Sequence, residues 1–264
     1  MEASSKAKII LGPPGTGKTT TLMNIIESLL EKGVKPEEIG FISFTKKATT
    51  EARDKARARF GFEVERLPFF RTIHSLAFRQ LGLSRQQVMQ HSHYQELCDE
   101  LGVEITGRQT GEDGTLVGMA HGDKLRFVEG MARIRCVPLK QQWEELNDDE
   151  LGWFELEQFA KALRDYKDNT GLIDYTDMLE LMRSEGHVPK LKALLVDEAQ
   201  DLSKLQWLVV ERMMEKADET YIAGDDDQAI FRWAGADVDH FIGLDGDVRI
   251  LDQSYRIPAV VHDL

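Results

Sequence analysis

Long apolar runs and paired cysteines are both missing from this sequence. No stretch approaches the roughly 20 apolar residues of a membrane-spanning helix, and the opening MEASSKAKIILG lacks the apolar core of a signal peptide. Its two cysteines, Cys98 and Cys136, lie far apart, without the spacing of a metal site or a disulfide framework. We therefore expect no membrane contact, two unpaired thiols and a cytoplasmic location.

Positive charge is also scarce. The 264 residues include 33 Lys and Arg against 46 Asp and Glu, a net charge of −13, which by itself argues against a nucleic-acid partner. The distribution of charge matters more than the sum. Residues 46–79 hold nine basic and four acidic side chains. This local basic track could meet a phosphate backbone.

Short apolar runs that end in glycine, proline or carboxylates alternate with helical periodicity. We predict strands within residues 7–12, 39–45, 191–200, 219–228 and 247–256, and a strand that passes into a helix within 67–78. This alternation predicts an α/β fold with a parallel sheet covered by helices on both faces. Residues 84–170 contain no clear buried strand, and we predict that they form a mostly helical insertion.

The segment GPPGTGKTT, residues 12–20, fits the pattern G-x-x-x-x-G-K-[ST] between a predicted strand and a predicted helix. Glycines let backbone N–H groups turn towards phosphate oxygens, and the helix N-terminus adds a favourable dipole. Lys18 would reach the β- and γ-phosphates, and the Thr19 hydroxyl could bind Mg²⁺. The predicted nucleotide-binding residues are Gly12, Pro13, Gly15, Thr16, Gly17, Lys18, Thr19 and Thr20.

A second motif, LLVDEAQD at residues 194–201, places two acids at the end of an apolar strand. In an open α/β sheet, ligands bind at that end of the strands. Asp197 could hold Mg²⁺, and Glu198 could orient or deprotonate an attacking water. The two motifs together predict hydrolysis of ATP or GTP, without showing what work the hydrolysis drives.

The order of the motifs resembles that of the UvrD/Rep-like superfamily 1 DNA helicases. The matching segments are GPPGTGKTTTL, SFTKKATTEARDKA, RTIHSLAFRQL, IDYTDML, LLVDEAQDLSKLQ, YIAGDDDQAIFRWAGAD and LDQSYRIPAVV. The resemblance implies a RecA-like P-loop NTPase domain 1A at residues 1–83 and 171–252, with an inserted helical subdomain 1B at 84–170. Residues 253–264 would begin a linker to a second RecA-like domain, which we expect to be missing from this chain.

The resemblance also implies roles for single residues. Lys18, Glu198 and Gln228 would be catalytic, and Arg256 would reach the γ-phosphate. Phe231 and Trp233 would stack on bases of single-stranded DNA, as aromatic faces do without selecting a sequence. Five further residues would line the same strand path: Phe44, Thr45, Lys46, Thr72 and His74.

The implied function is the motor half of an ATP-dependent DNA helicase that binds Mg-ATP and single-stranded DNA, moves in the 3′→5′ direction and is monomeric. One alternative is the helicase part of a recombination helicase–nuclease. Another is a nucleotide-gated single-strand-binding module that does not unwind. RNA is a third possibility, since backbone and stacking contacts discriminate poorly between the two nucleic acids.

Overall fold

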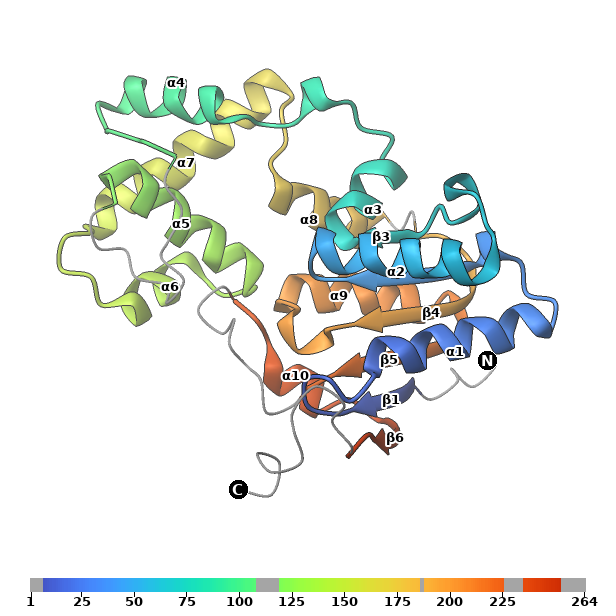
Figure 1. Cartoon of the computed structure of the whole chain (residues 1–264). Coiled ribbons are helices and arrows are strands. Elements are labelled where there is room, and N and C mark those ends of the chain that lie inside the picture. Colours follow the sequence, from blue (N-terminus) through green and yellow to red (C-terminus); the bar gives the residue numbers. More distant parts are fainter. Residues whose placement is uncertain (1–6, 108–118, 186–187, 226–234, 253–264) are drawn as a thin grey trace.

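The computed structural model describes residues 7–107, 119–185, 188–225 and 235–252. Its centre is a six-stranded sheet in the order β3-β2-β4-β5-β1-β6, and every neighbouring pair is parallel (Figure 1). The strands are β1 (Ala7–Leu11), β2 (Ile39–Ser43), β3 (Phe70–Thr72), β4 (Leu191–Asp197), β5 (Ala217–Gly224) and β6 (Gly246–Ile250). The predicted α/β class with a parallel sheet is confirmed.

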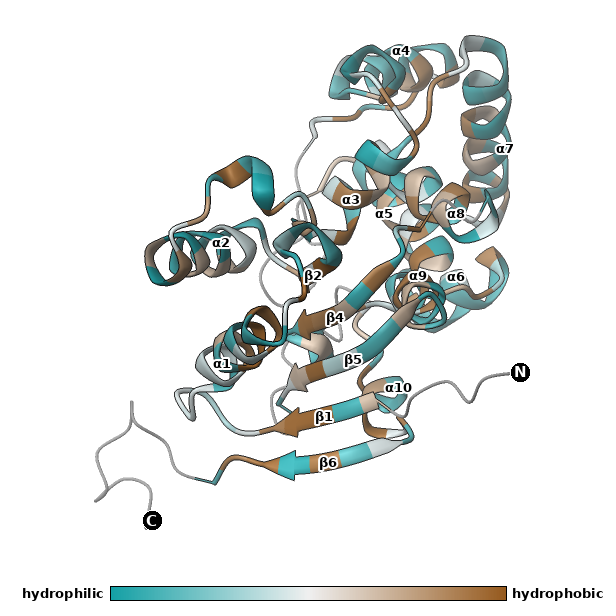
Figure 2. Ribbon diagram, turned by 90° about the vertical axis from the view of Figure 1, so that its right-hand side faces the viewer, coloured by the Kyte–Doolittle hydropathy of each residue, from teal (hydrophilic) through white to brown (hydrophobic). Residues whose placement is uncertain are grey.

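Helices cover both faces of the sheet, because successive strand residues point to opposite sides. In β4, Leu195 packs in the core under α1 (Lys18–Glu31) and α2 (Lys46–Phe60), whereas Leu194 packs in the opposite core. That second core contains residues of α3 (Ile73–Gln80), α8 (Tyr175–Glu185), α9 (Lys204–Met214) and α10 (Val238–Ile242). Figure 2 shows α1 and α2 on one side of the strands and α8 and α9 on the other.

Four of the helices between β3 and β4 form a separate body with its own hydrophobic core. Its helices are α4 (His91–Leu101), α5 (His121–Ile134), α6 (Leu139–Leu146) and α7 (Trp153–Thr170). Phe159 and Leu156 are buried in this core together with residues of α4 and α5. We call residues 91–170 the helical segment. It contains no strand among its described residues, as the sequence predicts.

The chain enters and leaves the helical segment at one place. The Met89 backbone N–H donates to the Ile173 carbonyl, and the Ile173 N–H donates to the Gln87 carbonyl, both at 2.9 Å.

Short 3₁₀ turns occur at Pro36–Glu38, Val64–Arg66, Arg85–Gln87 and Ala199–Asp201.

Local predictions agree with the structure in most details. Each predicted strand segment contains a strand, although β3 has only three residues before α3 begins at Ile73. Cys98 is buried, Cys136 is exposed and neither is disulfide-bonded, so the prediction of unpaired thiols is confirmed. Within the described residues, we find no helix with the length and apolar character needed to cross a membrane.

The buried centre of the sheet generates a stability prediction. Leu195→Ala should lower the free energy of unfolding by about 2–5 kcal/mol, because the side chain is fully buried and its removal leaves a cavity. Urea unfolding checks this value. Val248→Ala on the edge strand β6 is the control: its side chain is 55% exposed, and the same measurement should change by less than about 0.5 kcal/mol.

Candidate nucleotide and nucleic-acid sites

The parallel strands bring Lys18, Asp197 and Glu198 to one edge of the sheet. The loop 12–20 follows β1, Asp197 ends β4 and Asp225 follows β5. Although β5 separates β1 from β4, the Thr19 hydroxyl at the start of α1 donates to Asp197 Oδ2 at 2.8 Å. The two motifs therefore meet across 178 residues of sequence.

The loop 12–20 has the backbone of a phosphate-binding loop. Gly15 and Gly17 adopt φ values of +79° and +86°, a region that side chains disfavour. Lys18 is buried, and its ammonium donates to the carbonyls of Gly12 (2.6 Å) and Pro13 (3.3 Å). Phosphate oxygens would be stronger acceptors for this ammonium than neutral carbonyls, since charge-assisted hydrogen bonds are the stronger ones.

Asp197, at the end of β4, lies in an environment that disfavours its charge. Burial, together with the charge of Glu198, raises the pKa of Asp197 to about 6. Glu198 has a left-handed backbone, with φ +53°, at the point where the strand turns into the Ala199–Asp201 turn. Such strain in a non-glycine residue costs about 1–3 kcal/mol and is frequent at active sites.

Two residues of the DEAQD motif have contacts that the sequence analysis did not assign. Gln200 donates to Glu198 Oε2 at 2.9 Å and accepts from the Asp225 N–H at 3.0 Å, so it joins the ends of β4 and β5. Asp201 is also buried, and burial with the neighbouring Glu198 charge raises its pKa to about 7. Membership of the motif was the only sequence signal for either residue.

The donor chemistry beside the loop fits Mg²⁺. The Thr19 hydroxyl and the Asp197 carboxylate are hard oxygen donors that already lie in contact. No group of three or more His, Cys, Asp or Glu side chains in the described part of the chain could hold a metal. Mg²⁺ needs no such cage, because it is commonly held by one or two protein oxygens together with nucleotide phosphates and water.

A cleft of about 1090 Å³ opens between α2, α3, the 85–93 connection and the start of α8. We call it the basic cleft, because no described residue that lines it is Asp or Glu. Its basic lining residues are Lys46, Arg53, Arg71, His74, Arg85 and His93. The overall composition, with a net charge of −13, gives no reason to expect a cleft lined by basic side chains alone among its charged residues.

Two cations of the cleft are held close together. Arg71 donates to the Pro68 carbonyl at 2.7 Å and to the Ser75 hydroxyl at 3.2 Å. Burial, together with the charges of Arg79 and Arg53, lowers the pKa of Arg71. The buried Arg53 Nε has no hydrogen-bond partner among the described residues. An anion bound in the cleft would offset the repulsion between these positive charges.

Part of the predicted basic track lies away from this cleft. Arg59 donates to Asn24 and Glu27 on α1, and Arg66 donates to Glu37. These ion pairs face solvent, so the whole run 46–79 is not available to one phosphate backbone.

The predicted DNA-binding residues have mixed positions. Lys46, Thr72 and His74 line the basic cleft. Thr45 and Thr72 also cap helices, with Thr45 accepting from the Ala48 N–H and Thr72 from the Ser75 N–H. Phe44 is half-buried and packs against the core on the α3 side of the sheet. Gln228, Phe231, Trp233 and Arg256 lie outside the described residues.

Tyr175 is a cleft residue that the sequence analysis missed. It is 59% exposed at the first position of α8, and its ring stands edge-on to His74 with centroids 6.0 Å apart. The IDYTDML segment that contains it had been matched to the helicases, but an aromatic residue at a helix start carries no signal of exposure.

The motifs agree with comparisons against known proteins. DNA helicase II of Haemophilus influenzae is 26% identical over 95% of this chain, which covers 36% of that protein. The ATP-dependent DNA helicase PcrA of Bacillus subtilis is 24% identical over 94% of the chain and 35% of its own length. The ATP-dependent DNA helicase Rep of Buchnera aphidicola is 23% identical over 94% of the chain and 38% of its own length.

The chain therefore spans little more than a third of the length of these relatives. A family match covers nearly all of it: residues 1–249 match the UvrD/REP helicase N-terminal domain. With the loop 12–20, the acids after β4 and the parallel sheet in place, the chain belongs to the UvrD/REP helicase N-terminal domain family.

Proposed function

We propose that this chain is the N-terminal motor half of an ATP-dependent DNA helicase. In this proposal the chain binds Mg-ATP at the loop 12–20 and single-stranded DNA in the basic cleft. The relatives named above are DNA helicases. Within the proposal, residues 1–83 and 171–252 form the ATPase domain, 84–170 its helical insertion and 253–264 the start of a linker to a second motor domain. Movement in the 3′→5′ direction and a monomeric state are further parts of it.

The basic cleft is the observation that carries the nucleic-acid part of the proposal. Lys46, Arg53, Arg71 and Arg85 line it, and none of its described lining residues is Asp or Glu. Phosphate neutralisation by such side chains supplies affinity that does not depend on sequence. The exposed ring of Tyr175 adds a surface on which a base can stack.

At the nucleotide site, the loop 12–20 would hold the phosphates, with Lys18 and the Gly15 and Gly17 backbone as donors. Mg²⁺, held by Thr19 and Asp197, would neutralise charge on the phosphates. Glu198 is the base that would orient or deprotonate the attacking water. Its carboxylate accepts a hydrogen bond from Gln200, which holds it at the edge of the sheet.

The two proposed sites lie on the same edge, two strands apart. Ser43 at the end of β2 pairs with Asp197 of β4 on one side and with Thr72 of β3 on the other. Neighbouring strands are about 4.8 Å apart, so Asp197 and Thr72 lie about 10 Å from each other across the sheet. Since Thr45 and Lys46 follow β2 directly, a small movement at the nucleotide site would reach the cleft.

Substitutions at Lys18 and Glu198 test the nucleotide chemistry. Lys18→Ala should weaken ATP binding and nearly abolish hydrolysis, because the charge that meets the β- and γ-phosphates is lost. Glu198→Gln should bind ATP like the parent and lose most of the turnover, measured by phosphate release. Hydrolysis by Glu198→Gln at the parent rate would show that Glu198 is not the base.

Asp201 tests the electrostatic cost of the acidic cluster. Its folded pKa of about 7 lies above its ordinary value of 3.8, so the contribution of Asp201 to stability is fully present below about pH 4 and is lost as pH rises through 7. Asp201→Asn should therefore raise the free energy of unfolding at pH 8 by up to about 4 kcal/mol, and the gain should vanish near pH 4.

Urea unfolding at a series of pH values measures this difference. Asp218→Asn is the control: this exposed aspartate is paired with Lys192, which lowers its pKa, so its substitution should bring no gain at pH 8. A gain that is equal at pH 4 and pH 8 would contradict the assigned cause.

Tyr175 tests the basic cleft. Tyr175→Ala should weaken the binding of a fluorescein-labelled oligothymidylate by about 1–3 kcal/mol, the usual effect of losing one stacked base. Phe154→Ala is the matched control, because Phe154 is similarly exposed (65%) but does not line the cleft. Equal losses for both variants, by fluorescence anisotropy, would argue against the cleft as the binding site.

A further inference from the structure

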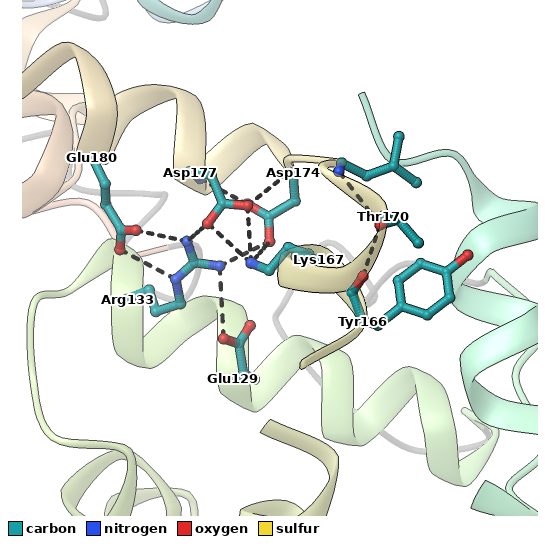
Figure 3. A network of polar contacts seen from close by, with 9 residues as sticks. Glu129, Arg133, Tyr166, Lys167, Thr170, Asp174, Asp177 and Glu180 are labelled. Atoms are coloured by element: carbon teal, nitrogen blue, oxygen red, sulfur yellow. Dashed lines mark hydrogen bonds and ion pairs between the residues drawn. The ribbon is translucent and has the colours of Figure 1, made fainter. Parts of the chain in front are cut away.

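A largely buried ionic network joins the helical segment to the N-terminal half of α8 (Figure 3). Arg133 on α5 donates to Asp174 and to Glu180, each at 2.8 Å, and it also contacts Asp177. Lys167 on α7 donates to both Asp174 and Asp177 at 2.9 Å. We call these five residues the ionic network. The residues of the network lie on α5, on α7, on α8 and just before α8, so the network connects α5 and α7 to α8.

The same two aspartates cap α8. The Asp174 N–H donates to the Asp177 carboxylate and the Asp177 N–H donates to the Asp174 carboxylate, both at 2.7 Å. This reciprocal pattern is that of a capping box at the start of a helix. The backbone of the first turn of α8 therefore depends on these two carboxylates, because each accepts a hydrogen bond from the backbone N–H of the other residue.

Those carboxylates need the two cations. Burial on its own would raise the pKa of Asp174, but the charges of Arg133 and Lys167 outweigh it and lower the pKa to about 2. Asp174 is 7% exposed, so little solvent can take over this role. Loss of either cation would leave the two adjacent carboxylates with one positive partner in place of two, so their repulsion within the cap would increase.

Tyr175 lies between the two capping residues in the sequence. While Asp174 and Asp177 contact Arg133 and Lys167, the Tyr175 ring is exposed in the basic cleft against His74. The backbone of Ile173, just before the cap, is bonded to Gln87 and Met89 of the connection that carries Arg85 into the same cleft. The first turn of α8 is thus held by Arg133 and Lys167 on one side, and it places the Tyr175 ring in the basic cleft on the other.

On this basis, which rests on the proposed function of the basic cleft, we propose that Arg133 and Lys167 are positioning residues for nucleic-acid binding. They hold the cap of α8, and the cap holds the Tyr175 ring in the cleft. The helical segment then contributes to strand binding through the ionic network, without a side chain of α5 or α7 touching the strand at this point.

Lys167→Met tests the inference, with Lys161→Met as its matched control. Lys161 lies on the same helix, but its ion pair with Asp165 is exposed to solvent. Affinity of the full chain for a fluorescein-labelled oligothymidylate is measured by anisotropy, and thermal unfolding is followed in parallel. Lys167→Met should lose affinity by a factor no larger than that of Tyr175→Ala, which is roughly 5- to 150-fold. Lys161→Met should bind like the parent.

The double variant Lys167→Met/Tyr175→Ala separates positioning from a general structural effect. If Lys167 acts through Tyr175, the double variant should bind like Tyr175→Ala alone, although its thermal stability falls further. Multiplied losses of affinity, or unchanged affinity in Lys167→Met while Tyr175→Ala is weakened, would overturn the inference. Unchanged affinity in Tyr175→Ala would instead overturn the proposed role of the cleft.

Asp177→Asn is the second variant, used where Lys167→Met does not fold. Asparagine keeps the oxygen that accepts from the Asp174 N–H and loses only the charge that binds Arg133 and Lys167. It should also weaken strand binding without adding to the effect of Tyr175→Ala. In a folded Lys167→Met background, Asp177→Asn should restore part of the lost affinity, because it removes one of the two repelling charges. Failure of both effects would count against positioning through the cap.

Discussion

The common direction of the strands is the constraint on which the rest of this structure depends. In a parallel sheet every strand ends at the same edge, so residues from distant parts of the chain are collected there. Thr19 and Asp197 come into hydrogen-bond contact in this way. The register of β2 between β4 and β3 then sets Asp197, Ser43 and Thr72 in one row. The proposed nucleotide site and the basic cleft share one edge because all strands of a parallel sheet end there.

Both proposed sites hold charge that the protein itself neutralises only in part. Burial raises the pKa values of Asp197 and Asp201, and neighbouring arginines contribute to the lowered pKa of Arg71. The Lys18 ammonium is bonded to backbone carbonyls of its own loop. Such groups lower the stability of the unliganded fold, and under the proposed function a bound cation, phosphates or a polyanion would offset their charge. Binding is favoured because it supplies the missing opposite charge.

The helical segment is attached differently from the helices that cover the sheet. It has its own apolar core, and its contact with α8 is made in part by charged side chains. Buried ion pairs contribute little net stability but require a specific geometry, because a misplaced partner leaves a buried charge unpaired. An ionic contact at this point therefore favours one orientation of α8 relative to α5 and α7, where an apolar contact could slide.

The amino-acid sequence by itself determined the class of fold, the strand positions, the phosphate loop and the acids after β4. These depend on local signals: apolar runs, glycines that permit a positive φ, and a motif contained within a few residues. Only the tertiary structure decided which side chains share a site. Of the basic run 46–79, Arg53 and Arg71 face the cleft, whereas Arg59 and Arg66 pair with acids elsewhere. Arg85 and Tyr175 enter the same cleft from segments almost a hundred residues apart. The spacing of residues in the sequence does not predict such contacts, because they depend on how the helices pack on the sheet.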